Sequence, residues 1–541
     1  MRKILCASVA LGLFIAGCGG ADFIPYRGSA TSREAPSTAP TFTPQFAGVP
    51  VFDRAEEPNV QFNTETYDHV VENAFLTAAR NPLSTFSVDV DTASYSIVRR
   101  FLIGGQLPPP GAVRIEELVN YFRYDDPPPT GDMPFSVNLE VAECPWNKAH
   151  RLARIGLKGR EFPHEDRPAS NLVFLIDVSG SMAAPNKLPL VQAGLKLLVE
   201  NLTPRDRVAI VVYAGNSGLV LPSTSGNYKE IIFSAIDQLR AGGSTHGSAG
   251  IQLAYQTVAD HFVAGGANRV ILCTDGDFNV GITNQSELVR LIEDRARSGI
   301  YLTVLGFGIG NYKDSTLEKL ADKGNGNYGY IDTPGEARKL LCEQLQGTLI
   351  TIAKDVKLQV EFNPVRVAAY RLIGYENRIL AAEDFKNDAK DAGDIGAGHS
   401  VTALYEIVPA GQSRETSASS RLEVDALKYQ NGVDTTPGTR TAEMFTVALR
   451  YKQPDSQAST RLGFAAVDKG LQLSQASPDF KWSAAVAAFG MALRDSQRQD
   501  AMPLAAITEL AQSSRSHDLA GHRTEFIQLV EAARRLSDDR H

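Results

Sequence analysis

The sequence contains little of what several large protein classes require. Its 541 residues include only five cysteines, which are too few and too scattered for a disulfide scaffold. No block of like charge occurs, and the net charge of −8 argues against nucleic acid as the main partner. After Gly17, no stretch approaches the roughly 18 apolar residues of a membrane-spanning helix. Collagen-like, coiled-coil and polytopic membrane proteins are therefore excluded.

The first residues have the pattern of an export signal. A basic start at 1–3 precedes an apolar run at 4–16 that is too short to span a bilayer. The run ends in Ile-Ala-Gly-Cys at 15–18, which resembles the bacterial lipobox. This resemblance implies that the leader is removed before Cys18, which then carries acyl chains; an ordinary secretory signal is the alternative. Gly19 stands where enteric lipoproteins of the inner membrane have Asp, which favours the outer membrane of the cell envelope.

The rest of the chain divides by composition and hydrophobic period. With 43% hydrophobic and 21% charged residues it is typical of globular proteins, and its length suggests about three domains. A segment rich in Pro, Ser and Thr cannot bury a core and is expected to be a flexible tether. We expect a leader (1–17), the tether (18–62), an N-terminal α+β region (63–165), an α/β domain (166–350), a β-rich C-terminal domain (351–475) and C-terminal helices (476–541).

The α/β domain is predicted from the alternation of strand patterns and helix patterns along the chain. Apolar strand runs at 172–176, 208–213, 270–273 and 301–305 alternate with amphipathic helical patterns at 188–201, 228–239, 248–262 and 285–297. Strands that are apolar on both faces, with helices between them, indicate a doubly wound, mostly parallel, Rossmann-like sheet. In such sheets ligands bind beyond the C-terminal ends of the strands.

Oxygen-bearing side chains gather at these predicted strand ends. The first strand runs into Asp177-Val-Ser179-Gly-Ser181, and a glycine-rich loop at 239–250 contains Thr245. The strand at 270–273 leads to Asp275. Carboxylate and hydroxyl oxygens without His or Cys suit Mg²⁺. The sequence therefore predicts a divalent-metal site where these three loops meet.

Together these residues resemble the von Willebrand factor A (VWA) domain and its metal-ion-dependent adhesion site. The resemblance implies that the hydroxyls of Ser179, Ser181 and Thr245 coordinate the metal, while Asp177 and Asp275 often act through water. It also implies one open coordination position for an Asp or Glu carboxylate of a protein partner. Mg²⁺ is the expected ion, with Mn²⁺ and Ca²⁺ as alternatives. In relatives the last helix of the domain shifts upon tighter binding, and its counterpart here is at 334–349.

The flanking regions resemble those of a family of bacterial VWA lipoproteins. The N-terminal marks are Phe-Ser-Val-Asp-Val-Asp-Thr-Ala-Ser-Tyr at 86–95 and Arg-Ile-Glu-Glu-Leu-Val-Asn-Tyr-Phe at 114–122. The C-terminal mark, in a domain of unknown function, is Gly-His-Ser-Val-Thr-Ala-Leu-Tyr-Glu at 398–406. We expect helices at 70–75 and 113–122, and flanking regions that pack together around the inserted α/β domain.

Other polar residues are weaker candidates. Asp89 and Asp91 are a possible acid–base pair, although a solvated strand face with a helix cap is favoured. His246 is expected at the rim of the metal site, and His399 has no sequence partner that makes it catalytic. The acidic loop at 387–394 lacks the spacing of a calcium loop and is expected to be a solvated turn.

No nucleophile–base or phosphate-binding motif is present, so we expect a binding protein and not an enzyme. The predicted function is a lipid-anchored envelope protein that binds an unidentified protein through the metal. Two alternatives stay open: a hydrolase that acts on envelope polymers, and a structural protein whose metal only stabilises the fold.

Overall fold

A computed structural model gives the fold. It describes residues 65–538 except for 164–165, 215–216, 244–247, 277–284, 310–312, 412–427, 429, 432–433, 436–440, 455, 495–501 and 517. The leader, Cys18 and the tether lie outside the described residues. Across the described part of the chain, no helix is both long enough and apolar enough to cross a bilayer.

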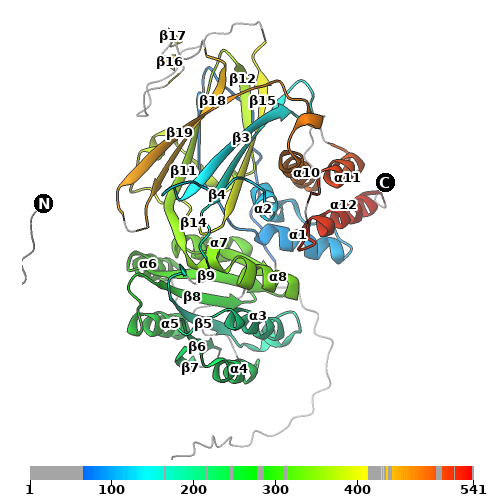
Figure 1. Cartoon of the computed structure of the whole chain (residues 1–541). Helices are drawn as coiled ribbons and strands as arrows, with labels where there is room; N and C mark the ends of the chain where they lie inside the picture. The colour runs from blue at the N-terminus through cyan, green and yellow to red at the C-terminus, as the bar shows by residue number, and fades with distance from the viewer. Residues whose placement is uncertain are drawn as a thin grey trace, which may run out of the picture. The chain divides into compact units, whose positions relative to one another are not determined.

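The α/β domain is built on a six-stranded sheet in the order β10-β9-β8-β5-β6-β7 (Figure 1). Its first five strands in this order are parallel, and the sequence predicted four of them but not β10. The antiparallel edge strand β7 was not predicted either. The strands are β5 (Ser170–Asp177), β6 (Arg207–Tyr213), β7 (Gly218–Ser225), β8 (Ala267–Thr274), β9 (Ile300–Phe307) and β10 (Tyr328–Ile331).

Helices cover both faces of this sheet. One core includes apolar side chains of α3 (Leu188–Glu200), α4 (Lys229–Asp237) and α8 (Pro334–Arg338). The other face is covered by α5 (Ser248–Asp260), α6 (Gln285–Arg297) and α7 (Asp314–Lys323). The predicted doubly wound α/β fold is therefore correct. The chain leaves the domain through a π-helical turn, η4 (Lys339–Glu343), and α9 (Leu345–Leu349).

The two flanking regions interleave in a pair of antiparallel sheets around one apolar core. In Figure 1 the cyan β4 lies beside the yellow β15, and eight residue pairs join these strands. One sheet holds β1 (Leu76–Thr77), β12 (Val367–Ile373), β15 (Ser400–Pro409), β4 (Arg151–Gly159) and β3 (Phe135–Glu143). The other holds β13 (Ile379–Leu380), β2 (Leu83–Ser87), β11 (Thr351–Phe362), β18 (Glu443–Lys452) and β19 (Ser459–Val467), with β14 (Ile395–Gly396) beside β11. The α/β domain is thus inserted between strands of one sandwich.

Helices from both ends of the chain form a further core. It joins α1 (Ala93–Ile103) and α2 (Ile115–Asn120) to α10 (Pro478–Leu493), α11 (Leu504–Ser513) and α12 (His522–Asp538). The predicted helix at 113–122 is shorter than expected, because α2 covers only Ile115–Asn120; a 3₁₀ turn, η1 (Pro110–Ala112), precedes it.

The helix expected at 70–75 is wrong. This segment has no regular secondary structure, and Val71 is 72% exposed. The side-chain amide of Asn73 donates to the carbonyls of Leu372 (3.1 Å) and Gly374 (2.9 Å) at the end of β12. Contacts with a distant strand therefore replace the local hydrogen bonds that a helix would provide.

Candidate metal-binding site

The turn after β5 presents one carboxylate and two hydroxyls. Asp177 is the last residue of β5 and is fully buried. The backbone N–H of Ser179 donates to Asp177 Oδ1 at 2.8 Å, which fixes the carboxylate against the turn. The hydroxyl oxygens of Ser179 and Ser181 lie 2.9 Å apart, and Ser181 is exposed. The turn therefore joins a buried carboxylate to a solvent-accessible hydroxyl.

The glycine-rich loop contacts this turn through its backbone. Gly180 N–H donates to the Gly243 carbonyl at 3.1 Å, and Gly242 N–H donates to the Val178 carbonyl at 2.7 Å. The loop thus reaches the turn at the residues just before the predicted ligand Thr245.

Two residues for which the sequence predicts a role, the metal ligand Thr245 and the rim candidate His246, lie outside the described residues. Asp277 and Asn279, which follow Asp275 and are further candidates for the rim of the site, lie outside them as well. Their roles stay predictions.

Asp275 reaches the same edge of the sheet from the neighbouring strand. It directly follows β8, which is parallel to β5, and it is 1% exposed. Burial raises the pKa of Asp177 to about 6, and the negative charge of Asp275 adds to the effect. The structure therefore places Asp177, Ser179, Ser181 and Asp275 at the same edge of the sheet, and their role as metal ligands stays a prediction.

The chemistry of this group fits a divalent cation. Asp177 Oδ2 and Asp275 Oδ1 are buried, and neither has a hydrogen-bond partner among the described residues. A buried carboxylate oxygen without a partner is costly in free energy unless a cation or donor meets it. Carboxylate and hydroxyl oxygens are the ligands that Mg²⁺ takes in proteins.

Two residues beside these predicted ligands were not expected from the sequence. The ammonium of Lys187 donates a hydrogen bond to Asp275 Oδ2 at 2.8 Å, and Lys187 is itself buried. Tyr213, the last residue of β6, is in register with Asp177, and burial together with that carboxylate holds its pKa well above the usual range. The position of Tyr213 at the end of a predicted strand could have indicated this residue from the sequence. The ion pair of Lys187 can be recognised only in the folded structure.

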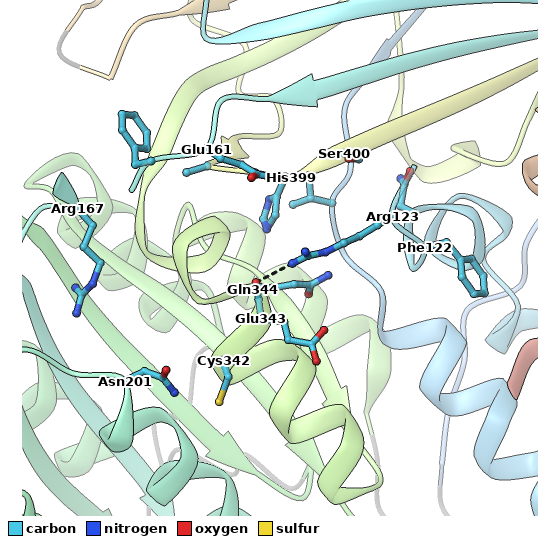
Figure 2. A pocket seen from close by; sticks show the side chains of 15 residues that line it. Phe122, Arg123, Glu161, Arg167, Asn201, Cys342, Glu343, Gln344, His399 and Ser400 are labelled. Carbon is cyan, nitrogen blue, oxygen red and sulfur yellow. Dashed lines mark hydrogen bonds between the residues drawn. The ribbon is translucent and has the colours of Figure 1, made fainter. Parts of the chain in front are cut away.

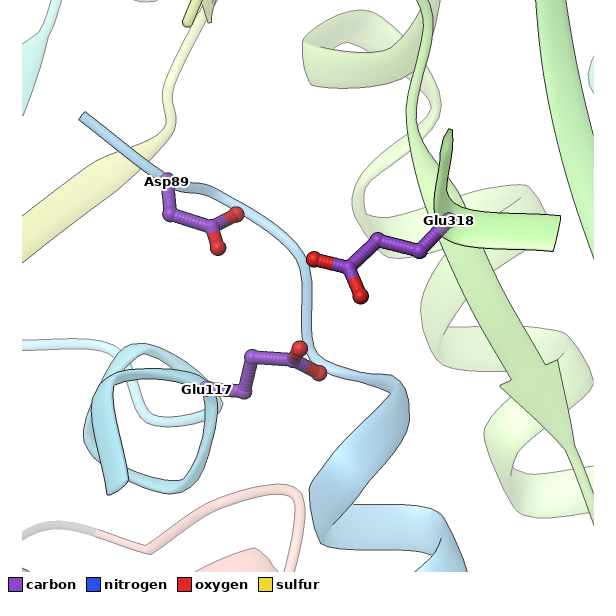
Figure 3. Close-up of side chains that lie close together, drawn as sticks. All are labelled: Asp89, Glu117 and Glu318. Carbon is purple, nitrogen blue, oxygen red and sulfur yellow. The ribbon is translucent and has the colours of Figure 1, made fainter. Parts of the chain in front are cut away.

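A second group of carboxylates lies where the three parts of the chain meet. Figure 3 shows Asp89, Glu117 and Glu318 turned toward one another, and all three are buried. Arg378 Nε donates to Asp89 Oδ2 at 3.0 Å and its Nη2 to Glu318 Oε1 at 3.2 Å. Arg114 Nε donates to Glu117 Oε1. Arginines from the described residues thus neutralise this group, which we interpret as an internal ion-pair network.

This network corrects the expectation for Asp89 and Asp91. Each is only 4% exposed, so the predicted solvated strand face is wrong. Asp89 Oδ1 accepts the backbone N–H of Asp91 at 2.9 Å, and Asp91 Oδ1 accepts the N–H of Tyr328 at 2.9 Å. The sequence could not show this, because Arg378 and Tyr328 are far away along the chain.

The acidic loop at 387–394 forms a turn in which one carboxylate, that of Asp394, has a buried oxygen. Asp388 and Asp391 are exposed, as expected. Asp394 Oδ1 accepts the backbone N–H of Asp355 at 3.1 Å, while its Oδ2 is buried with no partner among the described residues. Burial raises the pKa of Asp394 to about 7.

A cavity of about 220 Å³ lies beside the last helical turns of the α/β domain (Figure 2). Arg123, which lines it, donates to the Glu343 carbonyl at 2.9 Å. Burial, with nearby cations, lowers the pKa of His399 to about 4, so its imidazole is neutral at pH 7. Burial raises the pKa of the Cys342 thiol, which donates to the Leu197 carbonyl. A protonated thiol and a weakly basic imidazole do not make an activated nucleophile.

Comparison with protein families identifies the parts of the chain. Residues 171–342 match the von Willebrand factor type A domain, and residues 61–154 match a family described as von Willebrand factor. Residues 347–536 match the C-terminal part of the uncharacterized protein YfbK. The α/β domain is therefore a VWA domain, as the sequence resemblance implied.

Comparison with individual proteins shows to which family within the VWA class the chain belongs. The uncharacterized protein YfbK of Escherichia coli (strain K12) is 43% identical over 500 residues, which cover 90% of this chain and 85% of YfbK. The chain thus belongs to the YfbK family of bacterial VWA proteins. Human inter-alpha-trypsin inhibitor heavy chain H4 is 29% identical over 180 residues, covering 31% of this chain and 18% of that protein. A solved von Willebrand factor type A structure from Catenulispora acidiphila has 15% identity and a TM-score of 0.37, covering 70% of this chain and 87% of that chain.

Proposed function

We propose that this protein is a lipid-anchored component of the bacterial cell envelope that binds a protein partner through a divalent metal. The ligands would be Asp177, Ser179, Ser181, Thr245 and Asp275. The observation that carries the proposal is the pair of buried carboxylate oxygens, Asp177 Oδ2 and Asp275 Oδ1, that meet no partner among the described residues. Membership of the VWA class supports it, because metal-dependent adhesion is the activity that this resemblance implies.

The metal supplies a positive charge that can accept a carboxylate from outside the protein. The two aspartates reach the site from adjacent parallel strands, so the rigid sheet fixes their separation. Ser181 is exposed, which leaves this side of the turn accessible to a partner. An Asp or Glu side chain of the partner would complete the coordination, with Mg²⁺ as the ion that the oxygen ligands favour.

The anchor is proposed from the sequence. The lipobox-like Ile-Ala-Gly-Cys at 15–18 would be processed so that Cys18 carries the acyl chains, and Gly19 favours the outer membrane. Mass spectrometry of the mature N-terminus tests this step. We expect a tri- or diacylated Cys18, and we expect the Cys18→Ala variant to be absent from the membrane fraction.

Partner capture tests the central claim. Envelopes are crosslinked and the full chain is recovered, with Mg²⁺ or with chelator, and we expect a protein that is captured only with Mg²⁺. Asp177→Ala should abolish the capture, since it removes a ligand. Asp237→Ala, which removes an exposed carboxylate from α4, is the matched control and should capture normally.

The same experiment separates the proposal from its alternatives. Equal capture with Mg²⁺ and with chelator contradicts metal-dependent binding. A structural role for the metal predicts that Asp177→Ala loses its folded state, whereas binding predicts lost capture with an unchanged circular dichroism spectrum. Hydrolysis of envelope polymers by the Mg²⁺-loaded chain would favour the enzyme alternative.

A further inference from the structure

We propose that Lys187 is an intramolecular cation that competes with the divalent metal for Asp275, and so sets the metal affinity of the site. This inference rests on the proposed function. Lys187 lies in the same loop as the Asp177 turn, directly before α3. Its Nζ is 2.8 Å from Asp275 Oδ2, and the ammonium is buried with the carboxylate. An ammonium therefore already occupies one oxygen of a predicted metal ligand.

Two features of the position of Lys187 are unfavourable for an ammonium group. Only 4% of the residue is exposed, and a buried ammonium is costly unless it is paired. Lys187 is also the N-cap residue of α3, where the positive end of the helix dipole repels a cation. The ion pair with Asp275 is the contact that offsets both costs.

The backbone beside Lys187 is shaped to hold its side chain. Gly308 has φ +77°, and a Cβ added there would lie 2.4 Å from Lys187 Cε and 2.5 Å from Cγ. The Gly308 carbonyl accepts the Tyr330 hydroxyl at 2.5 Å and Arg100 Nη1 at 3.4 Å. Strand β10 and helix α1 therefore fix the surface against which the lysine packs.

The charges show why the lysine and the metal compete. Asp177 and Asp275 contribute two carboxylates to the site, and Lys187, which pairs with Asp275, contributes one ammonium. A divalent ion that approaches Asp275 meets the ammonium at the same carboxylate, so binding must weaken the ion pair. A partner carboxylate would add negative charge at this point. The metal and an acidic partner should therefore each increase the affinity for the other.

The test compares Mg²⁺ binding by the full-length protein and two variants, measured by isothermal titration calorimetry. Lys187→Met removes the buried cation, and we expect the dissociation constant for Mg²⁺ to fall by about ten-fold or more. Lys196→Met removes the same charge from within α3, at a partly exposed site where the lysine pairs with Asp237. This control should bind Mg²⁺ like the wild type.

Each outcome is decisive. Equal or weaker Mg²⁺ binding by Lys187→Met overturns the inference, while Mg²⁺ binding by the wild type would leave the proposed metal site intact. If neither protein binds Mg²⁺, the metal site and the inference fail together. In chelator, Lys187→Met should melt at a lower temperature than the wild type, because Asp275 loses its cation. Mg²⁺ should restore the melting temperature of this variant. A variant that does not fold even in saturating Mg²⁺, with Lys187→Gln behaving alike, also overturns the inference.

Discussion

Arg99 of α1 and Glu336 of α8 form a buried ion pair, with Nη2 and Oε2 2.8 Å apart. Arg99 Nε also donates to Asp332 at 2.9 Å, and its Nη1 donates to Glu525 of α12 at 3.0 Å. Tyr121 donates its hydroxyl to Glu336 Oε2 at 2.8 Å. A single guanidinium thus joins the N-terminal region, the VWA domain and the C-terminal helices.

Replacement of Arg99 should strongly destabilise the protein. Arg99→Met leaves Asp332 and Glu336 buried without their cation, and loss of one partner of a buried pair costs about 3–5 kcal/mol. Urea denaturation followed by circular dichroism measures the free energy of unfolding. Arg297→Met, at an exposed ion pair, is the control and should change it by less than about 1 kcal/mol. A similar small change for Arg99→Met would contradict the structural role.

Metal-dependent stability should depend on the Ser181 hydroxyl. Mg²⁺ at about 100 times its dissociation constant should stabilise the wild type by about 2.7 kcal/mol. Ser181→Ala removes a predicted ligand from an exposed position, so its melting temperature in chelator should match the wild type while the shift with Mg²⁺ shrinks. Differential scanning calorimetry measures both. The control is Ser234→Ala on the exposed side of α4, and a full Mg²⁺ shift in Ser181→Ala would remove this serine from the ligand set.

Asp394 should make stability decline with rising pH. Its pKa in the folded state is raised to about 7, so the folded protein holds a proton that the unfolded chain releases near pH 4. The stabilisation is complete below about pH 4 and is lost as the pH rises to about 7, at up to roughly 1.4 kcal/mol per pH unit. Asp394→Asn keeps the acceptor for the Asp355 N–H and should flatten this part of the profile. Unfolding titrations from pH 5 to pH 8 with the same slope in both proteins would contradict the assignment.

Metal binding should alter the packing of the last helical segment of the VWA domain. Lys339 Nζ donates to the Tyr121 carbonyl at 2.9 Å, so the π-helical turn at Lys339–Glu343 is attached to the N-terminal region. Such turns are rare and concentrate at functional sites. We expect hydrogen exchange at 334–349 to differ between Mg²⁺ and chelator in the wild type, and to be equal in Asp177→Ala. Equal exchange in the wild type under both conditions would argue against coupling between the site and this segment.

The sequence predicted the VWA domain well because its signals are local. Apolar runs flanked by amphipathic helices indicated β5, β6, β8 and β9, and the motif at Asp177 marked the end of β5. The edge strand β7 was missed because its apolar run is only three residues long (219–221) and is followed by a proline and polar residues.

The features that the sequence could not predict depend on distant partners. Lys187 meets Asp275 across 88 residues, and Arg378 meets Asp89 across 289 residues. The local hydrophobic periodicity of the sequence contains no information about pairs of residues that are so far apart along the chain. The segment at 70–75 has helix-like spacing, but the end of β12 supplies its hydrogen bonds instead.

The insertion of the VWA domain has a consequence for how the protein can be cut. The chain enters the domain after β4 and leaves it before β11, and both strands belong to the same sandwich. A protease that cleaves one connection would leave the domain attached by the other, so its release takes two cuts. During synthesis, the sandwich also stays incomplete until the ribosome has made β18 and β19, long after the metal-binding loops have emerged.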